Sequence, residues 1–260
     1  MIQYIASDLD GTLVPEGSQE MDPEVFELIR ELKKKGILFI AASGRQYANI
    51  RRLFKPVQDE IAYITENGSL SLCDGTVTRR GLIERDLGLS IIRAGRVYPD
   101  GCSCELSCES IVYLDSKDQQ FLDYMRDVIH YDTEVVDDLT KITKPFLKIA
   151  MCDFHGTEKL LPYFKERFAD QIEIVTAGKY WVDFIAPNAN KGTGLLSILQ
   201  ARHISPENGV AFGDEQNDIP MLKAAGTSYA LADSAPGIQQ YADHVTDSVI
   251  NVMRQILSEA

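Results

Sequence analysis

The sequence has no long hydrophobic run and comparatively little positive charge. No apolar stretch approaches the roughly 18 residues of a membrane-spanning helix, and no basic N-terminal segment precedes a short apolar core. The sequence contains 26 Lys and Arg residues and 39 Asp and Glu residues, which gives a net charge of −13. This charge opposes nonspecific binding to nucleic acid and to anionic membranes. We therefore expect a cytoplasmic protein that has neither a nucleic-acid nor a membrane partner.

Cysteine and histidine are also scarce. The five cysteines are an odd number in a chain of 260 residues, which is long enough to bury a sizeable core. We therefore expect reduced thiols rather than a disulfide framework. Cys102, Cys104 and Cys108 invite a zinc interpretation, but they lack paired spacing and need a fourth ligand from elsewhere in the chain. Buried strand cysteines are the alternative interpretation of this segment.

Two carboxylates follow the first strand-like segment. The alternating run at residues 2–6 leads into Ser7-Asp8-Leu9-Asp10-Gly11-Thr12-Leu13, where Gly11 permits a sharp turn. Asp8 and Asp10 therefore project together from the end of the strand. Like charges at this spacing repel unless a cation binds them or one is protonated. The turn therefore predicts that Asp8 and Asp10 serve a function that uses this arrangement. If the D-x-D motif stood alone, an Asp-rich surface turn would be the alternative interpretation.

Strand and helix patterns alternate along most of the chain. Apolar strand patterns at residues 37–42 and 61–64 are separated by helical patterns, and Asp74-Gly75 indicates a β-hairpin. The pattern changes between residues 82 and 187 to mixed strands and helices, and the β-α alternation then resumes. We expect a doubly wound, Rossmann-like α/β core with a parallel sheet, formed by residues 1–81 and 188–260. Residues 82–187 would form an inserted α+β domain.

Further polar residues stand where predicted strands end or helices begin. Ser43-Gly44-Arg45 follows the strand at 37–42, and Asp214 and Asp218 follow the strand at 209–212. Lys191 begins a helix, where a cation opposes the helix dipole by about 0.3–1 kcal/mol. We therefore expect Lys191 to face an anion, and its removal to leave the fold equally or slightly more stable. In an open parallel sheet these positions line one crevice.

The chemistry of these groups favours a magnesium ion and a phosphate. Mg²⁺ prefers hard carboxylate oxygens, keeps several waters and bridges to phosphate. Donors suited to the other phosphate oxygens are Ser43, Gly44, Lys191 and Asn217. One aspartate could attack phosphorus while a second protonates the leaving oxygen and later activates water.

The ordered motifs resemble those of a known family. D-L-D-G-T-L at Asp8, S-G-R at Ser43, K-G at Lys191 and G-D-E-Q-N-D at Gly213 are similar to the four motifs of the haloacid dehalogenase superfamily. The long insertion after the Ser43 motif resembles the Cof-like branch of magnesium-dependent phosphatases. The resemblance implies that the insertion is a cap domain that closes over the crevice.

The resemblance also implies a role for each motif residue. Asp8 would be the nucleophile, forming an aspartyl-phosphate, and Asp10 would be the general acid/base. The expected Mg²⁺ ligands are Asp8, the backbone carbonyl of Asp10, and Asp214, with Asp218 in support. The expected phosphate ligands are the Leu9 amide, Ser43, Gly44, Lys191 and Asn217.

We therefore expect Mg²⁺-dependent hydrolysis of a small phosphorylated metabolite, by analogy a sugar phosphate. A phosphomutase would share every motif and differ only in the acceptor. A receiver that uses a phospho-aspartate as a switch lacks an acid two residues after that aspartate and lacks the insertion. The spacing from Cys73 to Arg79 matches cysteine phosphatases, but the same residues fit a hairpin better. The four histidines lie outside the motifs, which disfavours histidine-based chemistry.

Overall fold

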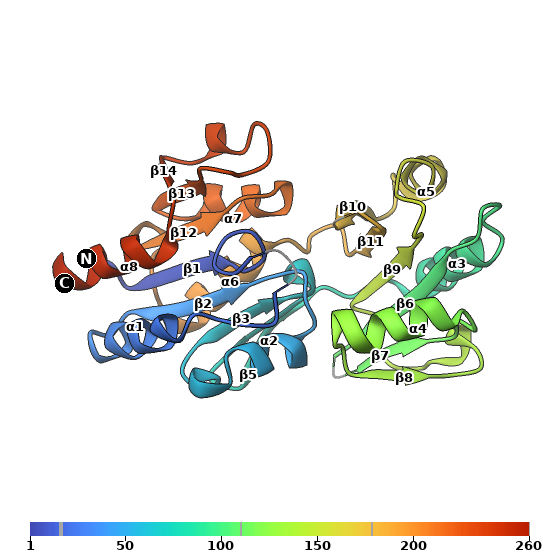
Figure 1. The fold of residues 1–260 in the computed structure, drawn as a ribbon, viewed down its shortest axis with the longest axis horizontal. Coiled ribbons are helices and arrows are strands. Elements are labelled where there is room, and N and C mark those ends of the chain that lie inside the picture. The colour runs from blue at the N-terminus through green and yellow to red at the C-terminus, as the bar shows by residue number, and fades with distance from the viewer. Residues whose placement is uncertain (16–17, 110, 178, 260) are drawn as a thin grey trace. The chain divides into compact units, whose positions relative to one another are not determined.

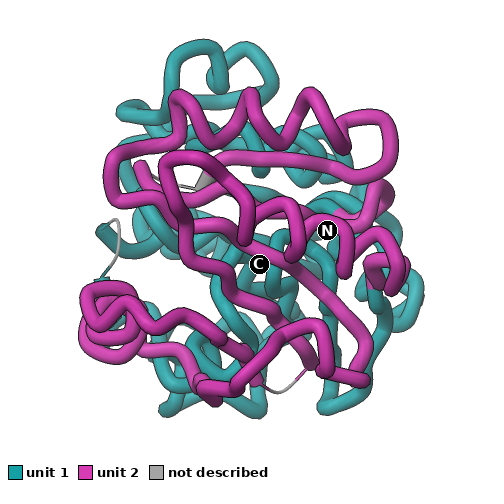
Figure 2. The backbone as a smooth tube through the Cα atoms, turned by 90° about the vertical axis from the view of Figure 1, so that its right-hand side faces the viewer, with its two compact units in different colours: residues 1–80, 190–260 teal, residues 81–189 magenta. Residues whose placement is uncertain are grey.

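The structure is a computed structural model that describes residues 1–15, 18–109, 111–177 and 179–259. The chain divides into two units, which Figure 2 shows in different colours. Unit 1 combines Met1–Arg80 with Asn190–Ala260, and unit 2 is Gly81–Ala189. Among the described residues, no helix has both the length and the apolar character that a membrane crossing requires.

An eight-stranded sheet forms the centre of unit 1. Its strands are β1 (Tyr4–Asp8), β2 (Leu38–Ala42), β3 (Ala62–Thr65), β4 (Leu70–Cys73), β5 (Thr76–Arg80), β12 (Gly209–Gly213), β13 (Thr227–Leu231) and β14 (His244–Thr246). They are arranged in the order β14-β13-β12-β1-β2-β3-β4-β5 (Figure 1). The pairs from β14 to β3 are parallel, whereas β4 and β5 pair antiparallel. The predicted α/β class is confirmed, with a hairpin that makes the sheet mixed rather than wholly parallel.

Helices cover both faces of this sheet. They are α1 (Pro23–Lys34), α2 (Tyr47–Leu53), α6 (Lys191–Arg202), α7 (Ile219–Ala224) and α8 (Val249–Glu259). Tyr4 and Ala6 of β1 pack in one apolar cluster with Leu195 of α6 and Met221 of α7. On β2, Phe39 contacts Phe54 at the end of α2, and Phe54 also contacts Phe26 of α1. All five residues of β1 are buried, as expected of a central strand in a sheet that is covered on both faces.

The β4–β5 hairpin has the predicted turn. Asp74 and Gly75 both have positive φ angles, 51° and 72°. This conformation is typical of the two-residue turns that match the twist of a hairpin, and Asp and Gly adopt it readily. Cys73 is the last residue of β4, so the segment from Cys73 to Arg79 consists of a strand end, the turn and most of β5.

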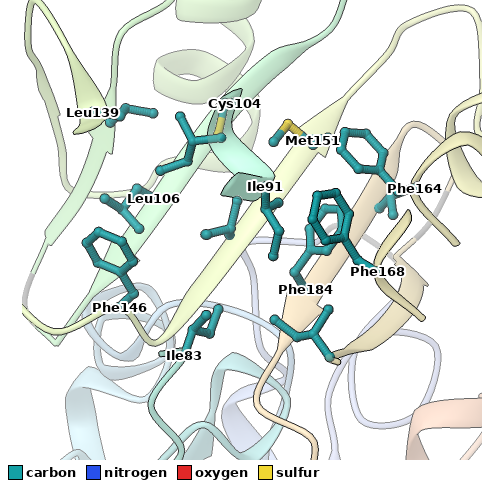
Figure 3. Packing of buried hydrophobic residues seen from close by; sticks show 14 of the residues in the cluster. Ile83, Ile91, Cys104, Leu106, Leu139, Phe146, Met151, Phe164, Phe168 and Phe184 are labelled. Atoms are coloured by element: carbon teal, nitrogen blue, oxygen red, sulfur yellow. The ribbon is translucent and has the colours of Figure 1, made fainter. Parts of the chain in front are cut away.

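Unit 2 is a six-stranded sheet with helices on both faces. Its strands are β6 (Ser103–Cys108), β7 (Ile111–Leu114), β8 (Thr133–Val135), β9 (Lys148–Cys152), β10 (Glu173–Ala177) and β11 (Trp181–Ile185), in the order β10-β11-β9-β6-β7-β8. Its helices are α3 (Arg85–Arg96), α4 (Gln119–Tyr124) and α5 (Leu160–Phe168). Ile91 of α3 and Phe164 of α5 pack on the face that carries Leu106 and Phe184 (Figure 3). Phe121 of α4 packs on the other face against Val112.

Helix α3 was not predicted from the sequence. Two glycines, Gly88 and Gly95, lower its helix propensity by roughly 1 kcal/mol each relative to alanine. The structure shows why they are there. A Cβ atom at Gly88 would lie 2.6 Å from the Phe146 ring, and one at Gly95 would lie 2.7 Å from the Met151 sulfur. Close packing of the helix on the sheet therefore requires residues that weaken the local helix signal.

Candidate active site

Strand β1 brings Asp8 to the carboxyl edge of the unit 1 sheet. Asp8 lies opposite Ala42 in the parallel register with β2, and Ser7 lies opposite Phe212 in the register with β12. Ser43 directly follows β2, and Asp214 directly follows β12. The structure therefore brings Asp8, Ser43 and Asp214 to the same edge. Asp8 is only 5% exposed, so its charge is poorly solvated by water.

Gly11 allows the chain after Asp8 to pass close to Asp214. Gly11 has a φ of 81°, and a Cβ atom there would lie 2.3 Å from the Asp214 carboxylate. The next residue uses that proximity, because the Thr12 hydroxyl donates a 2.6 Å hydrogen bond to Asp214. Glycine and threonine at these positions thus fix the Asp214 side chain relative to the turn.

Lys191 is buried between two carboxylates. It is the first residue of α6, behind the N-cap Asn190, and its side chain is 1% exposed. Its Nζ donates to Asp8 Oδ1 and to Asp218 Oδ1, each at 2.5 Å. Burial acts to lower the pKa of Lys191, but the Asp218 and Asp8 carboxylates outweigh it and raise that pKa above its usual range. The predicted anions facing Lys191 are therefore supplied by the protein itself.

Asp218 is fully buried, and three hydrogen-bond donors surround its carboxylate. Its Oδ1 accepts from Lys191, and its Oδ2 accepts from the backbone N–H groups of Asp214 and Glu215 at 3.0 Å. A Cβ atom at Gly213 would lie 2.4 Å from the Asp218 Cβ, so this loop folds tightly on itself. Asp218 therefore supports both Lys191 and the backbone that carries Asp214.

Asp8, Asp214 and Asp218 form the acid cluster of unit 1. One carboxylate oxygen from each lies within 4.8 Å of the other two, a spacing that could hold a metal ion. When all three carboxylates are ionised, the single Lys191 ammonium leaves two negative charges uncompensated in this poorly hydrated cluster. Burial raises the pKa of the Asp8 carboxyl group well above its usual value, and repulsion from Asp218 raises it further. A divalent cation would relieve this repulsion, so the donor set fits Mg²⁺.

Asp214 gives a pH-dependent prediction for the metal-free protein. Burial raises its pKa from 3.8 to about 6, against the opposing hydrogen bond from Thr12. Between these values the folded protein binds a proton that the unfolded chain releases, so the contribution of Asp214 to stability falls as pH rises. In EDTA at pH 7, Asp214→Asn should therefore raise the melting temperature by a few degrees. Calorimetry in EDTA checks this, and a lower melting temperature than that of the wild type would contradict it.

The Asp10 carboxylate is turned toward an arginine and lies outside the acid cluster. Arg45 Nε donates to Asp10 Oδ2 at 2.8 Å, and Arg45 Nη2 donates to Asp10 Oδ1. The Asp10 side chain is 30% exposed, whereas that of Asp8 is 7% exposed. The two carboxylates of the D-x-D motif are therefore held by different cations, Asp8 by Lys191 and Asp10 by Arg45. The metal role of the Asp10 carbonyl stays a prediction.

The other residues predicted to hold phosphate lie in the segments that follow strands β1, β2 and β12 of unit 1. Ser43 is 2% exposed, and its hydroxyl accepts from the N–H of Arg45 at 3.1 Å. A Cβ atom at Gly44 would lie 3.0 Å from the Asn67 amide oxygen, and Asn217 Nδ2 donates to that oxygen at 3.0 Å. Leu9 is fully buried. The phosphate-binding roles of these residues stay predictions.

Three residues of this region received no role from the sequence. Arg45 and Thr12 lie inside the S-G-R and D-L-D-G-T-L motifs. The sequence therefore located both residues, but it did not indicate which side chains they contact. Asn67 lies in the Glu66-Asn67-Gly68 turn after β3, where three consecutive residues have positive φ angles. Such backbone is costly for residues other than glycine, and it tends to occur at functional sites. An Asn-Gly pair directly after a strand is the signal that could have marked it.

The cysteines do not form a competing site. All five are free thiols, and Cys73, Cys104, Cys108 and Cys152 are buried. Burial, with repulsion from Asp74, raises the pKa of Cys73 to about 11, whereas a nucleophilic cysteine needs a lowered pKa. Within the part of the chain that the structure describes, the acid cluster is the one grouping of three or more potential metal ligands.

Comparison with known proteins places these features in a family context. A family model described as haloacid dehalogenase-like hydrolase matches residues 5–251. The 5-amino-6-(5-phospho-D-ribitylamino)uracil phosphatase YbjI of Escherichia coli is 24% identical over 98% of this chain and 96% of its own. A solved structure from Eubacterium rectale is 28% identical, covers 98% of this chain and 99% of its own, and has a TM-score of 0.89. The structure of the subclass IIB sugar phosphatase BT4131 has 22% identity, 98% coverage of both chains and a TM-score of 0.83.

Proposed function

Because this chain belongs to the haloacid dehalogenase-like hydrolases, we propose that it is a Mg²⁺-dependent phosphatase acting on a small phosphate monoester. The observation that carries the proposal is the buried Lys191 ammonium held between Asp8 and Asp218 beside Asp214. Two uncompensated negative charges at a strand edge are costly without a cation. The cost is explained if a divalent ion and a phosphoryl group complete the site.

Asp8 acts as the nucleophile in this proposal. Its carboxylate oxygen forms a bond to phosphorus as the bond from phosphorus to the leaving oxygen breaks, which leaves an aspartyl-phosphate. Asp10 donates a proton to the leaving oxygen and then removes one from the water that releases phosphate. The surroundings of the two carboxylates suit these different roles. Asp8, the nucleophile, is buried and paired with Lys191, whereas Asp10, the acid/base, is partly exposed.

The remaining polar groups bind and orient. Lys191 holds the Asp8 carboxylate and offsets the charge of the transferred phosphoryl group. Ser43, the Gly44 and Leu9 amides and Asn217 donate to phosphoryl oxygens. Asp8, the Asp10 carbonyl and Asp214 would hold Mg²⁺, with Asp218 in support. When bound, the ion supplies positive charge that lets an anionic carboxylate approach an anionic ester.

The substrate class rests on the relatives. YbjI is named for a phosphorylated ribityl compound and BT4131 for sugar phosphates. We infer that this enzyme also acts on a phosphorylated sugar or polyol, and that unit 2 serves as its cap domain. A panel of such esters, scored by phosphate release, tests the substrate class.

Metal removal is the direct test of the proposed chemistry. EDTA should abolish hydrolysis of phosphate monoesters and Mg²⁺ should restore it, because the acid cluster cannot accept an anionic substrate without a cation. Thiol alkylation should leave the restored rate largely intact, since the buried thiols take no part. Full activity in EDTA, with loss on alkylation of Cys73, would contradict the proposal.

A further inference from the structure

Arg45 holds Asp10 through a two-point contact. Its Nε and Nη2 donate to the two different oxygens of the Asp10 carboxylate. The planar guanidinium matches a carboxylate in this way, whereas a lysine ammonium can act only as a point charge. The contact therefore fixes the plane of the carboxylate and the direction of its remaining lone pairs.

The guanidinium is itself held from two other segments. Nη2 also donates to the Ser18 carbonyl at 2.7 Å, and Nη1 donates to Asn49 Oδ1 of α2 at 3.4 Å. The Arg45 side chain is 9% exposed, so it is packed as well as hydrogen-bonded. Its backbone is tied to the same edge of the sheet, because its N–H donates to Ser43 and its carbonyl accepts from the N–H of Glu66. Arg45 is therefore a rigid support for a side chain that stands on a turn.

We propose that Arg45 is a positioning residue that orients Asp10 for proton exchange with the leaving oxygen and then with water. This inference rests on the proposed function. Asp10 enters the first step protonated by solvent, which its 30% exposed side chain can reach, on a lone pair that Arg45 does not occupy. This proton passes to the leaving oxygen as the bond between that oxygen and phosphorus breaks and the Asp8 oxygen bonds to phosphorus. In the second step Asp10 takes a proton from the water that attacks the aspartyl-phosphate. Arg45 exchanges no proton in either step.

Leaving-group dependence separates positioning from a purely structural role. An alkoxide is a strong base and needs a proton as it departs, whereas p-nitrophenolate is a weak base and departs without one. The ratio kcat/KM reports the steps up to formation of the aspartyl-phosphate and is blind to the later water step that both esters share. Arg45→Ala should therefore lower kcat/KM about 100-fold or more for the best alkyl ester of a sugar-phosphate panel, and less than about 10-fold for p-nitrophenyl phosphate. Because both rates come from the same protein, a partly unfolded variant lowers both equally and leaves their ratio unchanged.

Two further variants sharpen the test. Arg45→Lys keeps the charge with one contact point and should fall between Arg45→Ala and the wild type, and added guanidinium should partly rescue Arg45→Ala on the alkyl ester. In a double-mutant cycle, Arg45→Ala should add little to the effect of Asp10→Asn, because Arg45 acts through Asp10. Arg51→Ala is the matched control. Arg51 is on α2 and pairs with Asp59 at 2.8 Å, so both rates should stay unchanged.

The outcomes are distinct. An equal loss of kcat/KM on both esters, or full additivity with Asp10→Asn, would overturn the positioning role of Arg45 while leaving a working phosphatase. A wild-type protein that hydrolyses neither ester in Mg²⁺ would instead overturn the proposed function, and the inference with it. A selective loss on the alkyl ester that guanidinium reverses is the result expected.

Discussion

Asp8→Asn is expected to abolish phosphoryl transfer, with a fall in kcat of about 10⁵-fold or more, as for the loss of other enzymic nucleophiles. The amide has nearly the same shape as the carboxylate, so its oxygen can still accept the hydrogen bond from Lys191. It cannot form the acyl-phosphate bond, because the amide is a very weak nucleophile. Steady-state phosphate release in Mg²⁺ measures the effect.

The control for this prediction is an aspartate of unit 1 outside the acid cluster. Asp243 accepts hydrogen bonds from the N–H and hydroxyl of Ser228 on β13, and Asp243→Asn should keep the wild-type rate. The folded state of Asp8→Asn is checked by its circular dichroism. More than about one-hundredth of the wild-type rate in a folded Asp8→Asn protein would show that another group attacks phosphorus.

Lys191→Met is expected to have the second largest effect, because it changes both activity and stability. The substitution removes the ammonium that lies between Asp8 and Asp218 and leaves two buried carboxylates without their cation. Breaking a buried ion pair in this way destabilises proteins by about 3–5 kcal/mol. Loss of a donor that faces the transferred group should also lower kcat by about 10²–10³-fold. Calorimetry and steady-state kinetics measure the two effects.

This expectation differs from the one drawn from the sequence alone. A lysine at a helix start opposes the helix dipole, which suggests that its removal costs no stability. The structure shows that two carboxylates at 2.5 Å outweigh the dipole. Mg²⁺ should restore part of the lost stability in Lys191→Met, because it neutralises the same carboxylates. A variant as stable as the wild type in EDTA would contradict the structural account of Lys191.

The fold class could be predicted because it depends on local patterns. The apolar strands β1 and β2 and the Asp74-Gly75 turn have strong signals of period and composition. Helix α3 could not be predicted, because Gly88 and Gly95 are there to fit Phe146 and Met151, which lie more than 50 residues away in the sequence. Long-range packing thus overrode the local propensity.

The candidate site also has features that the sequence predicts and features that it does not. The places of Asp8, Ser43 and Asp214 follow from strand ends, which sequence patterns locate well. Which cation serves which carboxylate does not follow, because Lys191 reaches Asp8 across 183 positions of sequence and Arg45 reaches Asp10 across 35. Such ion pairs form only when distant segments come together in the folded chain. The structure is therefore needed to show that Lys191 pairs with Asp8 and Arg45 with Asp10.

The most direct test of the central claim is to identify the phosphorylated residue during turnover. Wild-type protein is mixed with a good substrate and Mg²⁺, quenched in acid at successive times and analysed by mass spectrometry, while inorganic phosphate is counted in parallel. The proposal predicts a short-lived acyl-phosphate on Asp8, with many phosphates released per protein molecule and no such species in Asp8→Asn. A long-lived phosphoprotein without repeated turnover, or turnover without phosphate on Asp8, would contradict it.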